Sequence, residues 1–148
     1  VSDWSSDVCS SDLEPGDLAT RQASRYLIRQ DTKLLEKEIV RTAIDWALAR
    51  SIKKHGLTPD DFDWYLPHYS SNFFRDKFYQ AMKRIGFEIP YERWFTNLSE
   101  QGNTGSASIY ILMDELFKSG QLIKGLILLC FIPDSGRFSH VFMQLTVV

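Results

Sequence analysis

An uninterrupted apolar run at residues 126–132 (Leu-Ile-Leu-Leu-Cys-Phe-Ile) constrains the fold more than any other feature of the sequence. The run is far shorter than the ~20 residues that a membrane-spanning helix needs. No polar residue alternates with the apolar ones, so the pattern predicts a strand buried on both faces. A strand of that kind needs a layer of structure on each side of its sheet.

The segment that follows predicts the partner of this strand. Residues 133–136 (Pro-Asp-Ser-Gly) are typical of a turn. Residues 138–148 then alternate, with Val141, Met143 and Leu145 on one side of the chain and polar residues on the other. This pattern indicates a half-buried strand joined to the first by a hairpin.

Three segments predict helices and one predicts a further strand. Residues 33–54 carry a single apolar stripe, and residues 70–85 carry another behind a serine cap at Ser70 or Ser71. Residues 109–117 are apolar nearly all round, which predicts a helix buried on every side. A short buried strand is expected at 64–68. The order of elements favours a layered α/β fold with a mixed sheet.

The first residues differ in character from the rest. Residues 1–13 are rich in Ser and Asp, lack periodicity, and contain the near-repeat Trp-Ser-Ser-Asp and Cys-Ser-Ser-Asp. We interpret them as a non-native leader, such as translated adapter sequence; the alternative is a disordered native tail. On the first interpretation, part of the native chain before Glu14 is expected to be absent. Residues 14–32 then form a linker or the remnant of a preceding half, and 33–148 form the domain.

Composition narrows the functional classes. The 17 Lys and Arg residues against 19 Asp and Glu give a net charge of −2, which offers no electrostatic case for binding nucleic acid or an anionic membrane. The two cysteines cannot form a disulfide framework, and no signal peptide is recognisable. A cytoplasmic location is therefore expected.

Two polar residues stand at joints between predicted elements. His68 ends the short strand, right after Pro67, and Asn103 lies in a glycine-flanked turn before the apolar helix. Loops at the ends of buried elements commonly carry functional side chains. Each residue alone also has a structural interpretation: His68 as a satisfied structural histidine, and Asn103 as a helix cap or turn former.

The other residues that could carry chemistry are expected to have structural roles. His55 is expected to be a solvated residue at a helix end, His140 to be structural, and Cys130 to be an inert core thiol. Asp60 and Asp61 form an exposed turn pair with no reason to act as acid and base. No cysteine or histidine spacing predicts a metal site, and no glycine-rich loop predicts a phosphate site.

Taken together, these motifs resemble a known family. Residues 66–71 read Leu-Pro-His-Tyr-Ser-Ser, residues 102–108 read Gly-Asn-Thr-Gly-Ser-Ala-Ser ahead of the apolar helix, and two strands follow, joined by a turn that contains Gly136. The lead-in at 56–64 (Gly-Leu-Thr-Pro-Asp-Asp-Phe-Asp-Trp) fits as well. Over residues 33–148 the chain resembles the C-terminal half of beta-ketoacyl-acyl-carrier-protein synthase III, a thiolase-fold condensing enzyme.

The resemblance implies roles for three residues. The family uses a Cys-His-Asn triad, in which His68 and Asn103 would donate hydrogen bonds to the thioester carbonyl of malonyl-carrier protein. More weakly, it implies that the Gly136 backbone N–H serves an oxyanion. It further implies acyl-CoA or acyl-carrier-protein thioesters as substrates with no cofactor or metal, acyl carrier protein as partner, and a homodimer for the full-length enzyme.

The sequence also departs from the family. The family commonly has His-Gln-Ala-Asn where residues 68–71 read His-Tyr-Ser-Ser, and its last hairpin is richer in glycine. These changes suggest a specialised branch that joins larger beta-ketoacyl units. Neither Cys130 nor Cys9 is expected to be the nucleophile, so the chain alone is expected to be inactive in condensation. The alternatives are a non-catalytic partner or carrier-protein-binding module with the same fold, and a polyketide or hydroxymethylglutaryl-type synthase.

Overall fold

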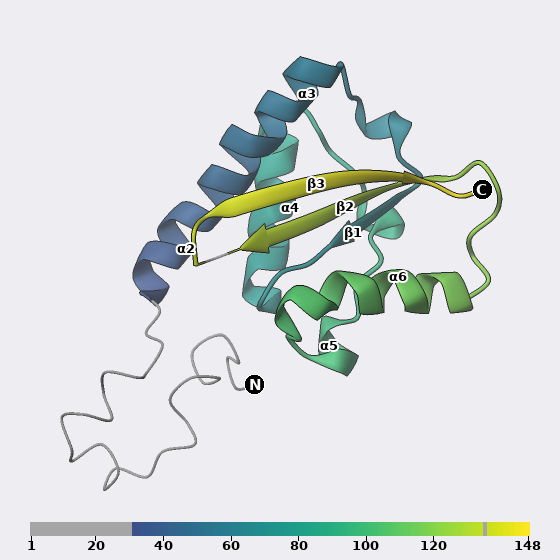
Figure 1. The fold of residues 1–148 in the computed structure, drawn as a ribbon. Helices are drawn as coiled ribbons and strands as arrows, with labels where there is room; N and C mark the ends of the chain where they lie inside the picture. The colour runs from purple at the N-terminus through teal and green to yellow at the C-terminus, as the bar shows by residue number, and fades with distance from the viewer. Residues whose placement is uncertain (1–30, 135) are drawn as a thin grey trace, which may run out of the picture.

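A computed structural model describes residues 31–134 and 136–148 (Figure 1). The predictions for the leader, for Cys9 and for most of the linker lie outside the described residues. The α-helices are α2 (Thr32–Val40), α3 (Ala49–His55), α4 (Arg75–Arg84), α5 (Leu98–Gln101) and α6 (Ser108–Lys118). The strands are β1 (Trp64–Pro67), β2 (Ile127–Asp134) and β3 (Ser139–Thr146). A π-helical stretch, η3 (Arg41–Leu48), joins α2 to α3. Short helical turns are η4 (Pro59–Asp61), η5 (Asn72–Phe74), η6 (Tyr91–Arg93) and η7 (Gly105–Ala107).

The described strands form one mixed sheet in the order β1-β2-β3. β1 pairs with β2 in parallel, from Trp64 opposite Leu128 to Pro67 opposite Phe131. β2 pairs with β3 as an antiparallel hairpin. The predicted layered α/β fold with a mixed sheet is thus confirmed.

The central strand extends further than its apolar run. β2 continues through Pro133 and Asp134, which pair with His140 and Ser139, so the prediction that the turn begins at residue 133 was wrong. Proline has no N–H to give to a neighbouring strand. It is tolerated here because the pairing with β1 ends at Phe131, two residues earlier.

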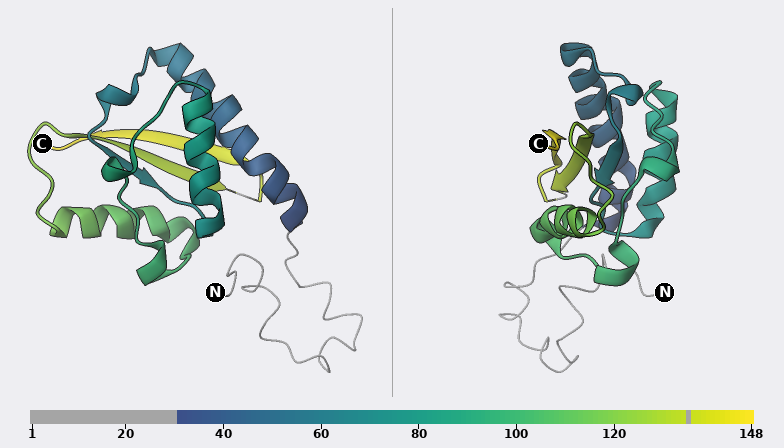
Figure 2. Two further views of the ribbon diagram at one scale, coloured as in Figure 1. Left: turned by 180° about the vertical axis from the view of Figure 1, so that it is seen from behind. Right: turned by 90° about the vertical axis from the view of Figure 1, so that its right-hand side faces the viewer.

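A long helical run and α4 cover one face of the sheet (Figure 2). The predicted helix at 33–54 is confirmed as a continuous run of α2, η3 and α3, in which η3 is a π-helix. The Asp31 side chain caps it by accepting the Leu34 N–H, and Gly56 ends it in the left-handed conformation at φ 66°. Beneath these helices the rings of Phe78 and Phe131 meet edge to face, with centroids 5.3 Å apart.

The helix predicted from 70 or 71 to 85 begins with a tighter turn. The Ser71 hydroxyl accepts the Phe73 N–H and caps η5, and α4 follows directly. The apolar stripe of this helix is buried at Phe74, Phe78 and Met82, whereas Ile85 at its end is only half-buried against the same cluster.

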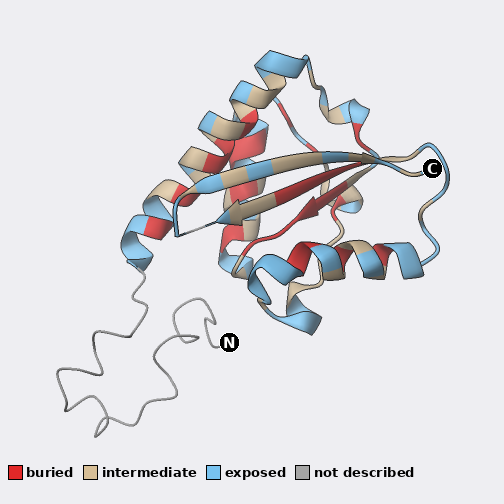
Figure 3. Cartoon of the chain, viewed as in Figure 1, coloured by how far each residue is buried: buried red, intermediate tan, exposed pale blue. Residues whose placement is uncertain are grey.

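A single helix, α6, covers the opposite face. Its residues Ile109, Leu112 and Leu116 are buried against the sheet. However, Tyr110 is 68 % exposed and Phe117 is 72 % exposed, so the prediction of a helix buried on every side was wrong (Figure 3). One helix on a sheet contacts it along one stripe only. The α5 segment hydrogen-bonds to α6 at Glu115 but leaves Tyr110 and Phe117 uncovered.

This topology brings distant segments to one end of the sheet. Because β1 and β2 are parallel, their carboxyl ends lie together, and His68 therefore lies beside the last residues of β2. Crevices at the carboxyl ends of parallel strands are common ligand sites in α/β folds.

Candidate functional site

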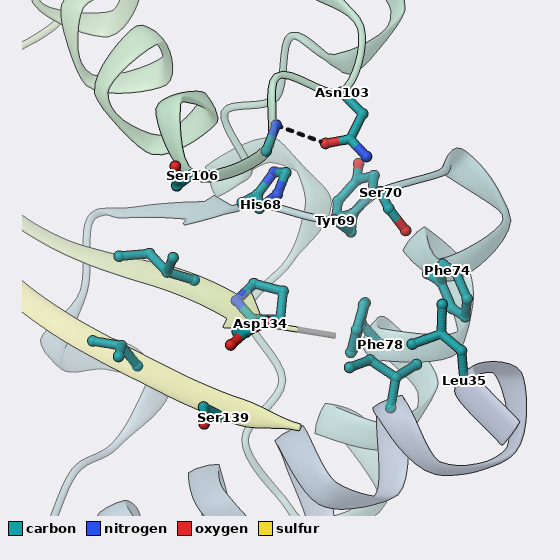
Figure 4. Close-up of a pocket in the computed structure, with 15 residues that line it drawn as sticks. Leu35, His68, Tyr69, Ser70, Phe74, Phe78, Asn103, Ser106, Asp134 and Ser139 are labelled. Atoms are coloured by element: carbon teal, nitrogen blue, oxygen red, sulfur yellow. Dashed lines mark hydrogen bonds between the residues drawn. The ribbon is translucent and has the colours of Figure 1, made fainter. Parts of the chain in front are cut away.

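A cavity of about 330 Å³ lies at this end of the sheet (Figure 4). Its polar lining includes His68, Asn103, Ser106 and Asp134. Much of the remaining wall is apolar and comes from α2, η5, α4, β2 and β3. The residues of this apolar wall are Leu35, Ile39, Phe74, Phe78, Ile132 and Val141. A few polar groups in an otherwise apolar cavity of this size are typical of a small-molecule site.

His68 is held at the cavity by the sheet. Its backbone N–H donates to the Phe131 carbonyl at 2.9 Å, which continues the parallel pairing one residue past β1. The side chain is buried, and burial lowers the pKa of His68 below its ordinary value. The neutral imidazole therefore predominates at neutral pH, with one N–H donor and one acceptor nitrogen.

Asn103 is fixed by its own turn. Its Oδ1 accepts the Gly105 N–H at 3.0 Å, so the interpretation as a turn former is confirmed. With the oxygen so used, the amide nitrogen Nδ2 remains to donate elsewhere. Among residues 31–134 and 136–148 this nitrogen has no hydrogen-bond partner, and in Figure 4 it lies on the side of Asn103 that faces Tyr69.

The structure thus brings His68 and Asn103 to one cavity from segments that lie far apart in the sequence. Each can present an N–H donor to the same space. Two fixed donors in a partly dry site stabilise negative charge that develops on an oxygen atom during a reaction. Their assignment as catalytic groups stays a prediction.

Gly136, the third candidate, is arranged differently. Its backbone N–H donates to the Asp134 carboxylate at 2.9 Å, and Gly136 is not among the residues that line the cavity. An oxyanion could use this N–H only by displacing the Asp134 carboxylate. The role implied for Gly136 stays a prediction.

The remaining cysteine and histidines match their structural interpretations. Cys130 lies within the cluster under α6, where burial raises the pKa of its thiol to about 11. His140 shares a 2.9 Å hydrogen bond between its Nε2 and Thr42 Oγ1, which ties β3 to η3. Burial lowers the pKa of His140, while the charge of Asp134 opposes that shift. His55 is an exposed residue at the end of α3.

Sequence reasoning missed two residues at the cavity. Tyr69 directly follows His68, is buried, and lines the cavity. Asp134 was assigned only to a turn, yet it also lines the cavity. For Tyr69 the available signal was its departure from the glutamine that the resembled family commonly has at this position.

No group of three or more His, Cys, Asp or Glu side chains in the described part of the chain is placed to hold a metal ion. No described helix is long and apolar enough to span a membrane.

Comparison with known proteins gives a consistent result. The family model described as 3-oxoacyl-[acyl-carrier-protein] synthase III C terminal matches residues 52–132. A beta-ketoacyl-[acyl-carrier-protein] synthase III of Acholeplasma laidlawii is 33 % identical over 104 residues, which cover 67 % of this chain and 31 % of that protein. A beta-ketoacyl-[acyl-carrier-protein] synthase III 2 of Bacillus subtilis is 36 % identical over 84 residues, covering 55 % of this chain and 24 % of that protein.

Solved structures agree on the fold. A beta-ketoacyl-[acyl-carrier-protein] synthase III of Thermus thermophilus aligns over 82 % of this chain and 36 % of its own, with a TM-score of 0.64 and 29 % identity. A 3-oxoacyl-(acyl carrier protein) synthase III of Pseudomonas aeruginosa aligns with a TM-score of 0.67 over 82 % of this chain and 36 % of its own, at 22 % identity, and supports the fold alone. The chain spans about a third of the length of these proteins.

Proposed function

The chain belongs to the 3-oxoacyl-[acyl-carrier-protein] synthase III family, with residues 52–132 matching the C-terminal model, and on that premise we propose that it supplies two hydrogen-bond donors to a decarboxylative Claisen condensation. The enzyme would join an acyl thioester to a malonyl- or beta-ketoacyl-carrier-protein unit, in the biosynthesis of fatty acids or of more specialised lipids and polyketides. The substrates would be thioesters, and no cofactor is needed for this chemistry.

His68 and Asn103 would act on the extender thioester. When the malonyl carboxylate leaves as CO₂, the electron pair of the broken C–C bond forms an enolate, with its negative charge on the thioester oxygen. The His68 ring N–H and the Asn103 amide would donate to that oxygen and stabilise the charge as it develops. The enolate carbon then attacks the acyl thioester carbonyl, and the thiolate departs.

The nucleophile that carries the acyl group would come from another part of the enzyme. Burial and the raised thiol pKa disqualify Cys130, which also lies under α6, away from the cavity. We therefore propose that the chain alone does not condense. The intact enzyme would act as a homodimer on acyl carrier protein, the substrate carrier in the names of its relatives.

One observation carries this proposal: His68 and Asn103, two residues from separate segments that can each donate an N–H, line the same 330 Å³ cavity. The apolar wall opposite them, which includes Leu35, Phe74 and Val141, suits an acyl chain or a thioester arm. A neutral His68 donates without adding a full positive charge, which matches the lowering of its pKa by burial.

The test is His68→Ala and Asn103→Ala in an intact enzyme that carries this chain together with a reactive cysteine. Each change should slow release of CO₂ from a malonyl thioester by roughly 10²–10³-fold, the usual effect of losing one such donor. His55→Ala is the matched control, because His55 is exposed at the end of α3. Unchanged CO₂ release in both cavity variants would contradict the proposal.

A second candidate is a non-catalytic subunit that binds a carrier protein. The observation in its favour is that the thiol of Cys130, the one described cysteine, is buried and its pKa is raised. On this alternative, a carrier protein binds the chain with the same affinity in the wild type and in both alanine variants, and no preparation releases CO₂.

A further inference from the structure

A second, much smaller cavity adjoins the main one and shares His68 and Tyr69 with it. Its volume is about 10 Å³. That volume is near the lower limit for one water molecule, which also needs two to four polar partners. The cavity lies against the segment that leads into α5, with Thr96, Asn97 and Ser108 in its lining.

The Tyr69 hydroxyl is the unsatisfied group at this place. Tyr69 is 3 % exposed, and its hydroxyl is buried without a hydrogen-bond partner among the described residues. The Thr96 side chain lies close enough to favour the ionised phenol, although the two groups do not meet with hydrogen-bond geometry. Buried polar groups in native proteins are nearly always bonded to protein or to ordered water.

Some of the other polar groups around the small cavity already make hydrogen bonds to protein atoms, and others are available to bind a water. Asn97 Nδ2 donates to Glu115 at 2.7 Å, and the Ser108 hydroxyl is paired with Thr104 Oγ1 at 2.9 Å. In contrast, His68 and Thr96 line the same cavity, and the side-chain neighbour that Thr96 is close enough to influence is the Tyr69 phenol. Together with Tyr69 they offer a water three available partners.

We propose that the small cavity holds one water molecule, which accepts a hydrogen bond from the Tyr69 hydroxyl and donates one to a ring nitrogen of His68. Tyr69 is then a positioning residue that fixes the tautomer of His68. The nitrogen that accepts from the water carries no proton, so the other ring nitrogen carries the N–H. That N–H is then directed to the main cavity.

The direction of these two hydrogen bonds, from Tyr69 through the water to His68, follows from the protonation states of the two side chains. Burial raises the pKa of Tyr69, so its hydroxyl keeps the proton and donates. Burial lowers the pKa of His68, so the imidazole is neutral and has one acceptor nitrogen. Only the consequence for catalysis rests on the proposed function, because the water and the tautomer can be observed without any turnover.

The experiment reads the ring-nitrogen chemical shifts of His68 by ¹⁵N NMR in the full 148-residue chain at pH 7.5, in solution or in a sedimented sample. The chain has three histidines, so His55→Gln and His140→Gln assign the signals. Wild-type His68 should populate one neutral tautomer. Tyr69→Phe removes a single oxygen atom and should shift the tautomer ratio by roughly 2- to 10-fold, the effect of one neutral hydrogen bond.

Tyr110→Phe is the matched control, because Tyr110 is an exposed tyrosine on α6 and should leave the His68 shifts unchanged. A high-resolution crystal structure gives the second readout: an ordered water within hydrogen-bond distance of Tyr69 Oη and a His68 nitrogen in the wild type. An empty cavity, or an equal tautomer shift in both tyrosine variants, overturns the inference. If the water and tautomer are as described but His68→Ala leaves CO₂ release unchanged, the proposed function fails and the inference stands.

Discussion

On one face of the sheet, α2, η3, α3 and α4 enclose a large aromatic and aliphatic core, whereas on the other face α6 alone covers a small cluster. Phe78 and Phe131 are almost completely buried on the first face. On the second, Tyr110 and Phe117 point away from the sheet and remain exposed. The first face therefore has the packing of a complete protein interior, and the second is covered on its inner side only.

This difference matters for the candidate site because the two donors depend on different layers. His68 follows β1 and is anchored by the Phe131 carbonyl of the central strand. Asn103 lies in the loop that leads into α6. We expect the His68 side of the cavity to be the more stable one, and the Asn103 side to follow the stability of α6.

The strongest test of this comparison is Phe131→Ala. Phe131 contacts Phe78 and stacks on Phe142 with centroids 4.9 Å apart. Its truncation should lower the free energy of unfolding by about 3–5 kcal/mol, measured by urea denaturation. Phe142→Ala is the control, since Phe142 is half-buried and should cost clearly less. Equal losses would contradict the central position of Phe131 in this core, since Phe142 packs at the edge of the same cluster.

Leu112→Ala tests the thinner face. Leu112 is 2 % exposed between α6 and the sheet, so its loss should cost about 2–3 kcal/mol, at the low end for a buried leucine. Hydrogen exchange should show that amides of α6 lose protection while those of α4 keep theirs. A uniform loss of protection over both helices would argue that the two layers unfold as one unit.

The protein should become less stable as the pH falls below neutral. Burial lowers the folded-state pKa of His68, so the unfolded chain binds more protons in the range below its ordinary pKa of about 6.5. The contribution of neutral His68 to the free energy of unfolding is fully present above this pH. It decreases as the pH drops, until the pH has passed below the folded-state pKa of His68. The slope contributed by His68 is at most about 1.4 kcal/mol per pH unit.

Denaturation at pH 7.5 and at pH 5.5 measures this dependence. His68→Gln should flatten it, as should His140→Gln, because burial lowers the pKa of His140 as well. A slope that survives in the double variant of His68 and His140 would assign it to other groups.

The smallest effect on stability is expected at the outer side of α6. Phe117→Ser should change the free energy of unfolding by less than about 0.5 kcal/mol, because Phe117 is 72 % exposed. The same change should reduce self-association of the chain in analytical ultracentrifugation, because exposed apolar groups promote association. A large loss of stability would show that Phe117 is buried in solution.

The sequence predicted the sheet well because burial on both faces leaves a direct mark on composition. The unbroken apolar run at 126–132 indicated the central strand, and the alternation after it indicated a half-covered partner. The helix at 33–54 followed from its stripe in the same way. The end of β2 was missed because Pro133 and Asp134 are typical turn-forming residues. They can continue the strand only because its pairing with β1 ends at Phe131, so that no partner needs the missing N–H of Pro133.

The candidate site was only partly predictable. His68 and Asn103 stood out by their places between elements and by a family resemblance, but nothing local in the sequence shows that one cavity receives both. The engagement of the Gly136 N–H by Asp134 depends on the shape of the hairpin, which residue types do not determine. The unpaired hydroxyl of Tyr69 is likewise a property of the packed structure.

The sequence by itself determined which segments become strands and helices, because apolar periodicity and turn residues act over a few neighbouring positions. It also determined that residues 109–117 form an apolar helix. Only the tertiary structure decided how many sides of α6 are covered, and that the parallel ends of β1 and β2 bring His68 and Asn103 to one cavity. Those outcomes depend on contacts between residues far apart in the chain, which no local pattern encodes.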